Sequence, residues 1–156
     1  MRAVRLIVAS MIVAMATAPA VAEPEHIIYV ELLGKGGLWG AGYELQPTRW
    51  LAFGGVASYY ELGGDRYATL SPYAAVYPLR RGQHAWYVQL GPQLVHRSTP
   101  SPVPEWSGMS TTAFDAELST GYEHRSARGM VVRVGMLVEV GERVVPWLGA
   151  SFGWAL

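Results

Sequence analysis

Large apolar residues alternate with small or polar ones along most of the chain, and this period of two constrains the fold more than any other feature. The stretch LGASFGWAL, residues 148–156, shows it most clearly, with its large residues on one parity and its small or polar residues on the other. Successive side chains of a β-strand point to opposite faces, so the pattern predicts strands with two different faces. The absence of a 3.6-residue apolar period argues against a helical fold.

Eight segments with this alternation follow residue 25, separated by short turn signals rich in Gly and Pro. The predicted strands cover residues 26–33, 38–46, 49–61, 66–78, 83–96, 109–123, 129–140 and 143–156. Pro47-Thr48 is expected to interrupt the strand pattern. Pro72 is expected to distort its strand, because proline has no N–H to donate to the hydrogen-bond ladder. The connection over residues 97–108 is the longest and contains three prolines.

The first 22 residues have the order of a secretory signal peptide. Arg2 and Arg5 precede a short apolar run over residues 6–16, and Ala20-Val21-Ala22 offers small residues for cleavage. A membrane-anchor helix is the weaker interpretation, because Pro19 interrupts the run before about 20 apolar residues accumulate. The chain is therefore divided into a signal peptide, residues 1–22, and one β-barrel domain, residues 23–156.

Composition excludes several classes of function. Without Arg2 and Arg5, ten basic and twelve acidic residues remain and form no basic stripe, so nucleic acid is not an expected partner. Cysteine is absent, which excludes disulfides, a thiol enzyme and a lipid anchor on cysteine. His26, His84, His96 and His124 have no metal-ligand spacing, so neither a metal nor a cofactor is predicted.

Three features indicate that the apolar face points outward, into lipid. The polar face is rich in Gly, Ser, Ala and Gln, whereas a soluble surface is about 25–35% charged. The apolar face carries large residues at nearly every position of several segments. Aromatic residues lie near strand ends, as expected at membrane–water interfaces. They are Trp39, Tyr43, Trp50, Tyr59, Trp86, Tyr122, Trp147 and Trp154.

The fold class predicted from these features is all-β, an eight-stranded antiparallel up-and-down transmembrane β-barrel. In lipid every backbone N–H and C=O must be paired, and a closed sheet leaves no unpaired edge. The charged residues of the inner face are expected to form a network in the lumen, made of Glu44, Asp115, Glu117, Arg133 and Glu139. Glu31 joins this network if the alternation of its strand also directs Glu31 inward. A general acid/base pair among these carboxylates and a narrow aqueous conduit are the alternatives.

The whole mature chain resembles the small eight-stranded outer-membrane barrels of Gram-negative bacteria, of the OmpA-transmembrane and OmpX type. Members of that class end in an alternating strand that the barrel-assembly machinery recognises. The resemblance implies that the C-terminal insertion signal here is Leu148, Ala150, Phe152, Trp154 and Leu156. It implies further that outer-membrane lipid surrounds the barrel. With both chain termini in the periplasm, the long connection over residues 97–108 is expected to be extracellular.

A fainter resemblance connects residues 90–105, LGPQLVHRSTPSPVPE, with lipid A deacylase barrels. Those enzymes carry a His-x-Ser-Asn stretch and an acidic partner, and His96, Ser98 and Glu105 would supply such residues here, without the Asn. The sequence favours a non-enzymatic integral outer-membrane protein with a structural or surface-interaction role. A lipid A-modifying esterase is the alternative, and a soluble periplasmic lipocalin-like ligand-binding barrel is a third interpretation.

Overall fold

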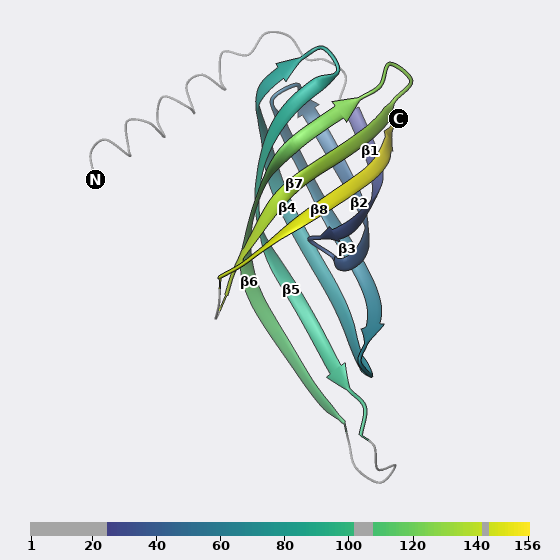
Figure 1. Cartoon of the computed structure of the whole chain (residues 1–156), viewed down its shortest axis with the longest axis vertical. Coiled ribbons are helices and arrows are strands. Elements are labelled where there is room, and N and C mark those ends of the chain that lie inside the picture. The colour runs from purple at the N-terminus through teal and green to yellow at the C-terminus, as the bar shows by residue number, and fades with distance from the viewer. Residues whose placement is uncertain (1–24, 102–107, 142–143) are drawn as a thin grey trace, which may run out of the picture.

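The computed structural model describes residues 25–101, 108–141 and 144–156, which form one closed barrel (Figure 1). Its strands are β1 (Glu25–Gly34), β2 (Gly37–Thr48), β3 (Leu51–Leu62), β4 (Asp65–Arg81), β5 (His84–Thr99), β6 (Met109–Arg125), β7 (Met130–Val140) and β8 (Val144–Ala155). Every strand is antiparallel to its neighbours, and β1 pairs with β8 from Ile27↔Ala155 to Leu32↔Ala150. The predicted eight-stranded antiparallel barrel is confirmed.

The predicted signal peptide at residues 1–22 and the candidate residue Glu105 lie outside the described residues. Among the described residues, no helix is long and apolar enough to cross a membrane.

The barrel has two different ends. At the proximal end β1 begins and β8 ends, and short turns connect β2 to β3, β4 to β5 and β6 to β7. The other four connections lie at the distal end, which is lowermost in Figure 1. The rim there is uneven, because the β3–β4 and β5–β6 hairpins extend farther than the β1–β2 and β7–β8 hairpins (Figure 1).

Strands β4 and β6 are among the strands that are longer than the sequence predicted. Strand β4 has 17 residues and continues through the turn expected after Pro78, with a register irregularity between Val76 and Leu79. Strand β6 also has 17 residues and ends at Arg125, inside the turn expected at residues 124–128. The irregularity accommodates Pro78, because proline is tolerated where the ladder is locally disrupted.

The predicted breaks at two other prolines are smaller than expected. Strand β2 continues through Pro47 to Thr48, with an irregularity between Leu45 and Thr48. At Pro72 the β3–β4 ladder is unbroken, and the β4–β5 register is the same at Leu70↔Leu94 and Ala74↔Leu90. Pro72 therefore causes no change in strand register. The register change in β4 lies between Val76 and Leu79, next to Pro78.

The predicted inversion of faces is confirmed. Phe114 is 73% exposed and Phe152 is 57% exposed on the outer wall, whereas Glu44 and Glu123 are almost inaccessible inside. Four tyrosines also point inward and are buried: Tyr29, Tyr73, Tyr77 and Tyr87. The predicted exterior position of Trp147 is wrong, because it pairs with the buried Leu137 and shares its inward parity at the distal mouth.

Candidate functional site

Arg133 on β7 joins two buried carboxylates in the proximal half of the lumen. Its Nε donates a hydrogen bond to Glu123 Oε2 at 2.7 Å, and its Nη2 donates to Glu44 Oε1 at 2.8 Å. Glu123 comes from the neighbouring strand β6, whereas Glu44 comes from β2 on the other side of the barrel. One guanidinium therefore connects opposite walls, and both ion pairs are removed from solvent.

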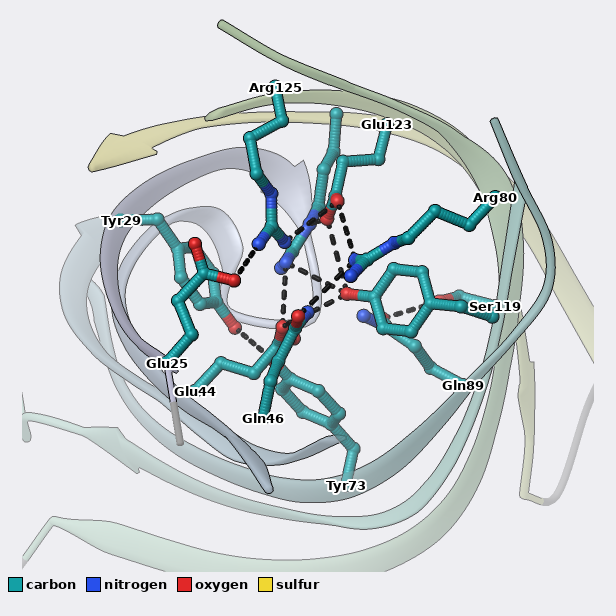
Figure 2. A network of polar contacts seen from close by, with 12 residues as sticks. Glu25, Tyr29, Glu44, Gln46, Tyr73, Arg80, Gln89, Ser119, Glu123 and Arg125 are labelled. Atoms are coloured by element: carbon teal, nitrogen blue, oxygen red, sulfur yellow. Dashed lines mark hydrogen bonds and ion pairs between the residues drawn. The ribbon is translucent and has the colours of Figure 1, made fainter. Parts of the chain in front are cut away.

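Tyrosine hydroxyls complete the hydrogen bonding of these carboxylates (Figure 2). Tyr73 donates to Glu44 Oε2 at 2.8 Å and lies 2.8 Å from the hydroxyl of Tyr29. Tyr77 Oη lies 3.0 Å from Glu44 Oε1 and 3.1 Å from Glu123 Oε2. Buried charges are tolerated when their remaining acceptors are satisfied, and these phenols supply the donors.

A second layer closes the proximal end of the network (Figure 2). Arg80 Nη2 donates to Gln46 Oε1 at 3.2 Å and to Glu123 Oε1 at 3.3 Å. Arg125 Nη2 donates to Glu123 Oε1 at 2.8 Å, and its Nη1 pairs with Glu25. The ion pairs of this proximal network are formed by Arg80, Arg125 and Arg133 with Glu25, Glu44 and Glu123. Its formal charges balance.

The turn between β1 and β2 folds into the distal half of the lumen. The carbonyl of Lys35 accepts hydrogen bonds from Gln93 Nε2 at 2.6 Å and from Ser71 Oγ at 3.2 Å. The carbonyl of Gly36 accepts one from Ser58 Oγ at 2.7 Å. These three donors come from β3, β4 and β5, so the turn is anchored across the barrel and narrows the lumen from the distal side.

Carboxylates outnumber cations around this turn. Lys35 Nζ lies 3.3 Å from Glu31 Oε1, and Glu117 lies nearby with 3% of its surface exposed. Neither Glu31 Oε2 nor Glu117 Oε2 has a hydrogen-bond partner among the described residues. Asp115 and Glu139 are half-buried on the same inner face, farther toward the mouth.

The lumen is packed between these two groups. A cavity of about 20 Å³ lies there, lined by Tyr29, Glu31, Tyr87, Ser119 and Arg133 among others. That volume holds about one water molecule. The described residues contain no group of three His, Asp or Glu side chains arranged to hold a metal ion. The arrangement can stabilise a closed barrel, and the space is too small for an aqueous channel.

The five side chains predicted to line the lumen all have inward parity, yet they do not form one network. Glu44 and Arg133 form an ion pair. Asp115, Glu117 and Glu139 lie in the distal half, and none of them forms an ion pair with Arg133. The single charge network expected from the pattern is in fact two separate groups.

Sequence reasoning missed several members of the proximal network. Arg80 and Arg125 fall in segments predicted as turns, because β4 and β6 were expected to end earlier. The alternation does place Glu123 on the same face as Glu117, so parity was the signal that could have identified it. The inward tyrosines carry the same parity signal, which is visible for Tyr73 beside Ser71 and for Tyr87 beside Gln89.

The candidate esterase residues lie far from the buried network. His96 and Ser98 share the outer face of β5, as their spacing predicts, and Glu105 lies outside the described residues. His96 Nδ1 is 3.0 Å from Thr112 Oγ1 on β6. The described residues place no carboxylate in hydrogen-bond contact with His96.

The C-terminal stretch forms an outward-facing row on β8. Leu148, Phe152 and Trp154 are exposed on the wall, and Ala150 lies between them on the same face. Leu156 follows the end of the strand and is also exposed. The pattern expected of an insertion signal is thus presented on the outer surface, and its recognition by an assembly machinery stays a prediction.

Comparisons with known proteins find likeness in structure alone. No family model matches the chain, and no curated protein matches it. The N-terminal β-barrel domain of Pseudomonas aeruginosa OprF superposes with a TM-score of 0.66 at 14% identity, covering 88% of this chain and all of that domain. Ail, the attachment invasion locus protein of Yersinia pestis, superposes with a TM-score of 0.52 at 11% identity, covering 85% of this chain and 93% of Ail.

At these identities the likeness shows the fold. The chain has the fold of the small eight-stranded outer-membrane barrels, as the resemblance in its sequence implied. The fainter resemblance to lipid A deacylase barrels gains no support from these neighbours.

Proposed function

We propose that this protein is an integral outer-membrane protein of a Gram-negative bacterium that acts in surface interaction and does not catalyse a reaction. The observation that carries the proposal is the closed barrel with an apolar outer wall and an ion-paired interior. Such a barrel satisfies every backbone group of its wall internally, which is the condition for spanning hydrocarbon. The same apolar wall would be an aggregation hazard in water.

The proximal end is assigned to the periplasm. Its connections are short turns, whereas the long β5–β6 connection lies at the distal end. Bacterial barrels have short periplasmic turns and longer extracellular loops, which supports this orientation. A signal peptide at residues 1–22 would bring the chain to the periplasm, from which it inserts.

The outer surface changes character near the distal end, which marks the proposed membrane boundary. One row across the wall is apolar and consists of Leu70, Leu94 and Phe114. Four residues farther along each strand, the next comparable row is polar and consists of Arg66, Ser98 and Ser110. Beyond the apolar row, β3 to β6 therefore extend into water as a projecting sheet made of residues 58–62, 65–69, 95–99 and 109–113.

The projecting sheet has an open edge on β6. Among the residues that the structure describes, β7 pairs with β6 only from Ala116↔Val140 onward, so residues 109–115 have β5 as their one described neighbouring strand. Residues 109–114, MSTTAF, contain neither a charge nor a proline. Natural proteins protect such edges with Lys, Pro or a covering loop. An extended polypeptide that adds a strand at this edge is the partner that we propose.

Lysine substitutions test the edge. The double variant Ser110→Lys/Thr112→Lys places charges on β6, and His96→Lys/Ser98→Lys places them on the directly paired residues of β5. Linear peptides selected from a displayed random library against the refolded barrel should lose binding in the first variant and retain it in the second. They should also slow amide exchange over residues 109–115. Equal loss in both variants would contradict pairing at the edge.

Arginine substitutions test membrane integration. Leu118→Arg and Val134→Arg place a charge on the outer wall, at a cost of about 2–4 kcal/mol each near the bilayer midplane. We expect both to block insertion, measured by urea-resistant membrane association and by the heat-modifiable shift on gels. Thr112→Arg, on the projecting sheet, should insert normally. Normal insertion of both wall variants would refute the proposed orientation of the faces.

The absence of catalysis is tested on the lipid itself. Mass spectra of lipid A from cells with and without the protein should be the same. Loss of an acyl chain that disappears in His96→Ala would instead establish the esterase alternative.

A further inference from the structure

A hollow of about 810 Å³ lies on the outer wall. It is lined by residues of β1, β5, β6, β7 and β8, among them Leu33, Trp86, Thr120, Gly135, Leu148 and Ala150. Its volume falls within the range of small-molecule binding sites, and nearly all of its lining is apolar. A barrel wall is ordinarily convex, so a hollow of this size needs a structural cause.

A row of glycines forms the floor of the hollow. Gly121, Gly135 and Gly149 are aligned in register across β6, β7 and β8. Their missing side chains would point into the lumen, where a Cβ on Gly121 or Gly135 would collide with Tyr87 Oη. Without these side chains the three strands lie closer to the lumen, and the wall is correspondingly indented on its outer side.

Leu33 forms part of the hollow's wall through an unusual backbone conformation. Its φ is +51°, and it is the only described residue other than glycine with a positive φ. The left-handed region is unfavourable for a branched residue, and such strain concentrates at functional positions. Because of this backbone conformation, the inward–outward alternation of side chains is interrupted. The consecutive residues Leu32 and Leu33 are therefore both exposed, at 57% and 54%.

The polar side chains of the hollow already have hydrogen-bond partners, and the Tyr122 hydroxyl is bonded to His84 Nδ1. Trp86 Nε1 donates to Thr120 Oγ1 at 3.0 Å, and Thr120 Oγ1 donates to the carbonyl of Tyr87 at 2.9 Å. No charged side chain lines the hollow. A ligand with polar groups would find no partners for them there, at a cost of about 1–3 kcal/mol for each buried group.

We propose that this hollow binds one hydrocarbon chain of a membrane lipid. The inference rests on the proposed function, because the hollow lies on the wall assigned to the bilayer. A hydrocarbon chain has no polar atoms to satisfy and adapts to an apolar surface. A second copy of the protein fits less well, because a two-fold interface brings the same patch of both copies together and two hollows would leave a void.

Photolabelling from the lipid phase tests the site. The barrel is reconstituted in phosphatidylcholine vesicles that contain a phosphatidylcholine with a diazirine on one acyl chain, and cross-linked residues are mapped after irradiation. Labelling within residues 120–122, 134–136 and 148–150 should exceed labelling of the outward residues of β2 and β3 several-fold. Uniform labelling around the wall would overturn the site while leaving membrane integration intact. Absence of labelling anywhere would overturn the proposed function itself.

Two matched variants connect the labelling to the hollow. Ala150→Trp fills it, whereas Ala57→Trp adds the same bulk to β3, away from the hollow. The first should reduce labelling of the hollow to the level of the remaining wall, and the second should leave the pattern unchanged. An unchanged pattern in Ala150→Trp overturns the proposal.

Leu33→Gly supplies a variant that should fold, because glycine accepts a positive φ. It removes one wall of the hollow and should also reduce the labelling. Cross-linked dimers that form through Trp86 or Leu148 in place of lipid adducts would identify a second copy as the occupant and overturn the proposal.

Discussion

Charged side chains are paired differently in the two halves of the lumen. In the proximal half, three arginines pair with three glutamates and tyrosine hydroxyls satisfy the remaining acceptors. In the distal half, Lys35 pairs with Glu31, whereas the inward-facing Asp115, Glu117 and Glu139 form no ion pair among the described residues. Every charge of the proximal half is paired, and Arg125 Nε is its only buried polar atom without a hydrogen-bond partner among the described residues, whereas the distal half leaves carboxylate oxygens of Glu31 and Glu117 without partners.

The largest expected effect comes from the centre of the proximal network. Arg133→Met leaves Glu44 and Glu123 buried without their shared cation, which should lower the free energy of unfolding by about 3–5 kcal/mol. Lys35→Met removes one ion pair in the distal half and should cost less. Urea denaturation of the vesicle-embedded barrel, followed by tryptophan fluorescence, measures both. Equal losses would mean that the two halves are not energetically different.

Two Glu→Gln substitutions should have opposite effects. Glu123→Gln weakens hydrogen bonds to three arginines and should cost about 2–3 kcal/mol. Glu117→Gln replaces a buried carboxyl group that has an unpartnered oxygen, so the barrel should be equally stable or more stable. The urea midpoints of the two variants give the comparison. A loss in Glu117→Gln as large as that in Glu123→Gln would show that Glu117 is also a structural member of an ion pair.

The smallest effect concerns the inward turn. Ser58→Ala removes the hydrogen bond to the carbonyl of Gly36, which should cost about 1 kcal/mol. The turn is then held less firmly, so Lys35, the only lysine of the chain, should react faster with an amine reagent. Ser98→Ala on the projecting sheet is the control and should leave that rate unchanged. An unchanged rate in Ser58→Ala would mean that the other donors to the turn suffice.

Parity in the sequence was enough to predict the barrel and the facing of most residues. It placed Leu118 and Val134 outside and Glu44 and Arg133 inside, because each strand repeats every two residues. It could not predict that Glu44 and Arg133 form a pair, since they are 89 residues apart and meet only across the closed barrel.

Strand ends and local backbone irregularities limited the rest. Pro78 predicts the end of its strand and places Arg80 in a turn, whereas β4 continues to Arg81. Nothing in the alternation indicates that Leu33 has a positive φ or that the β1–β2 turn enters the lumen. Both features depend on contacts with distant strands, which a local pattern does not contain.

The cross-barrel ion pair has a consequence for the order of assembly. Arg133 reaches Glu44 only after β1 has joined β8, because β2 lies across that seam from β7. A half-formed sheet would bring Glu44 into hydrocarbon without its cation, although Tyr73 and Tyr77 on β4 could still donate to it. Insertion into the bilayer and pairing of β1 with β8 are therefore expected to be coupled, and the Arg133–Glu44 ion pair is expected to be among the last contacts to form.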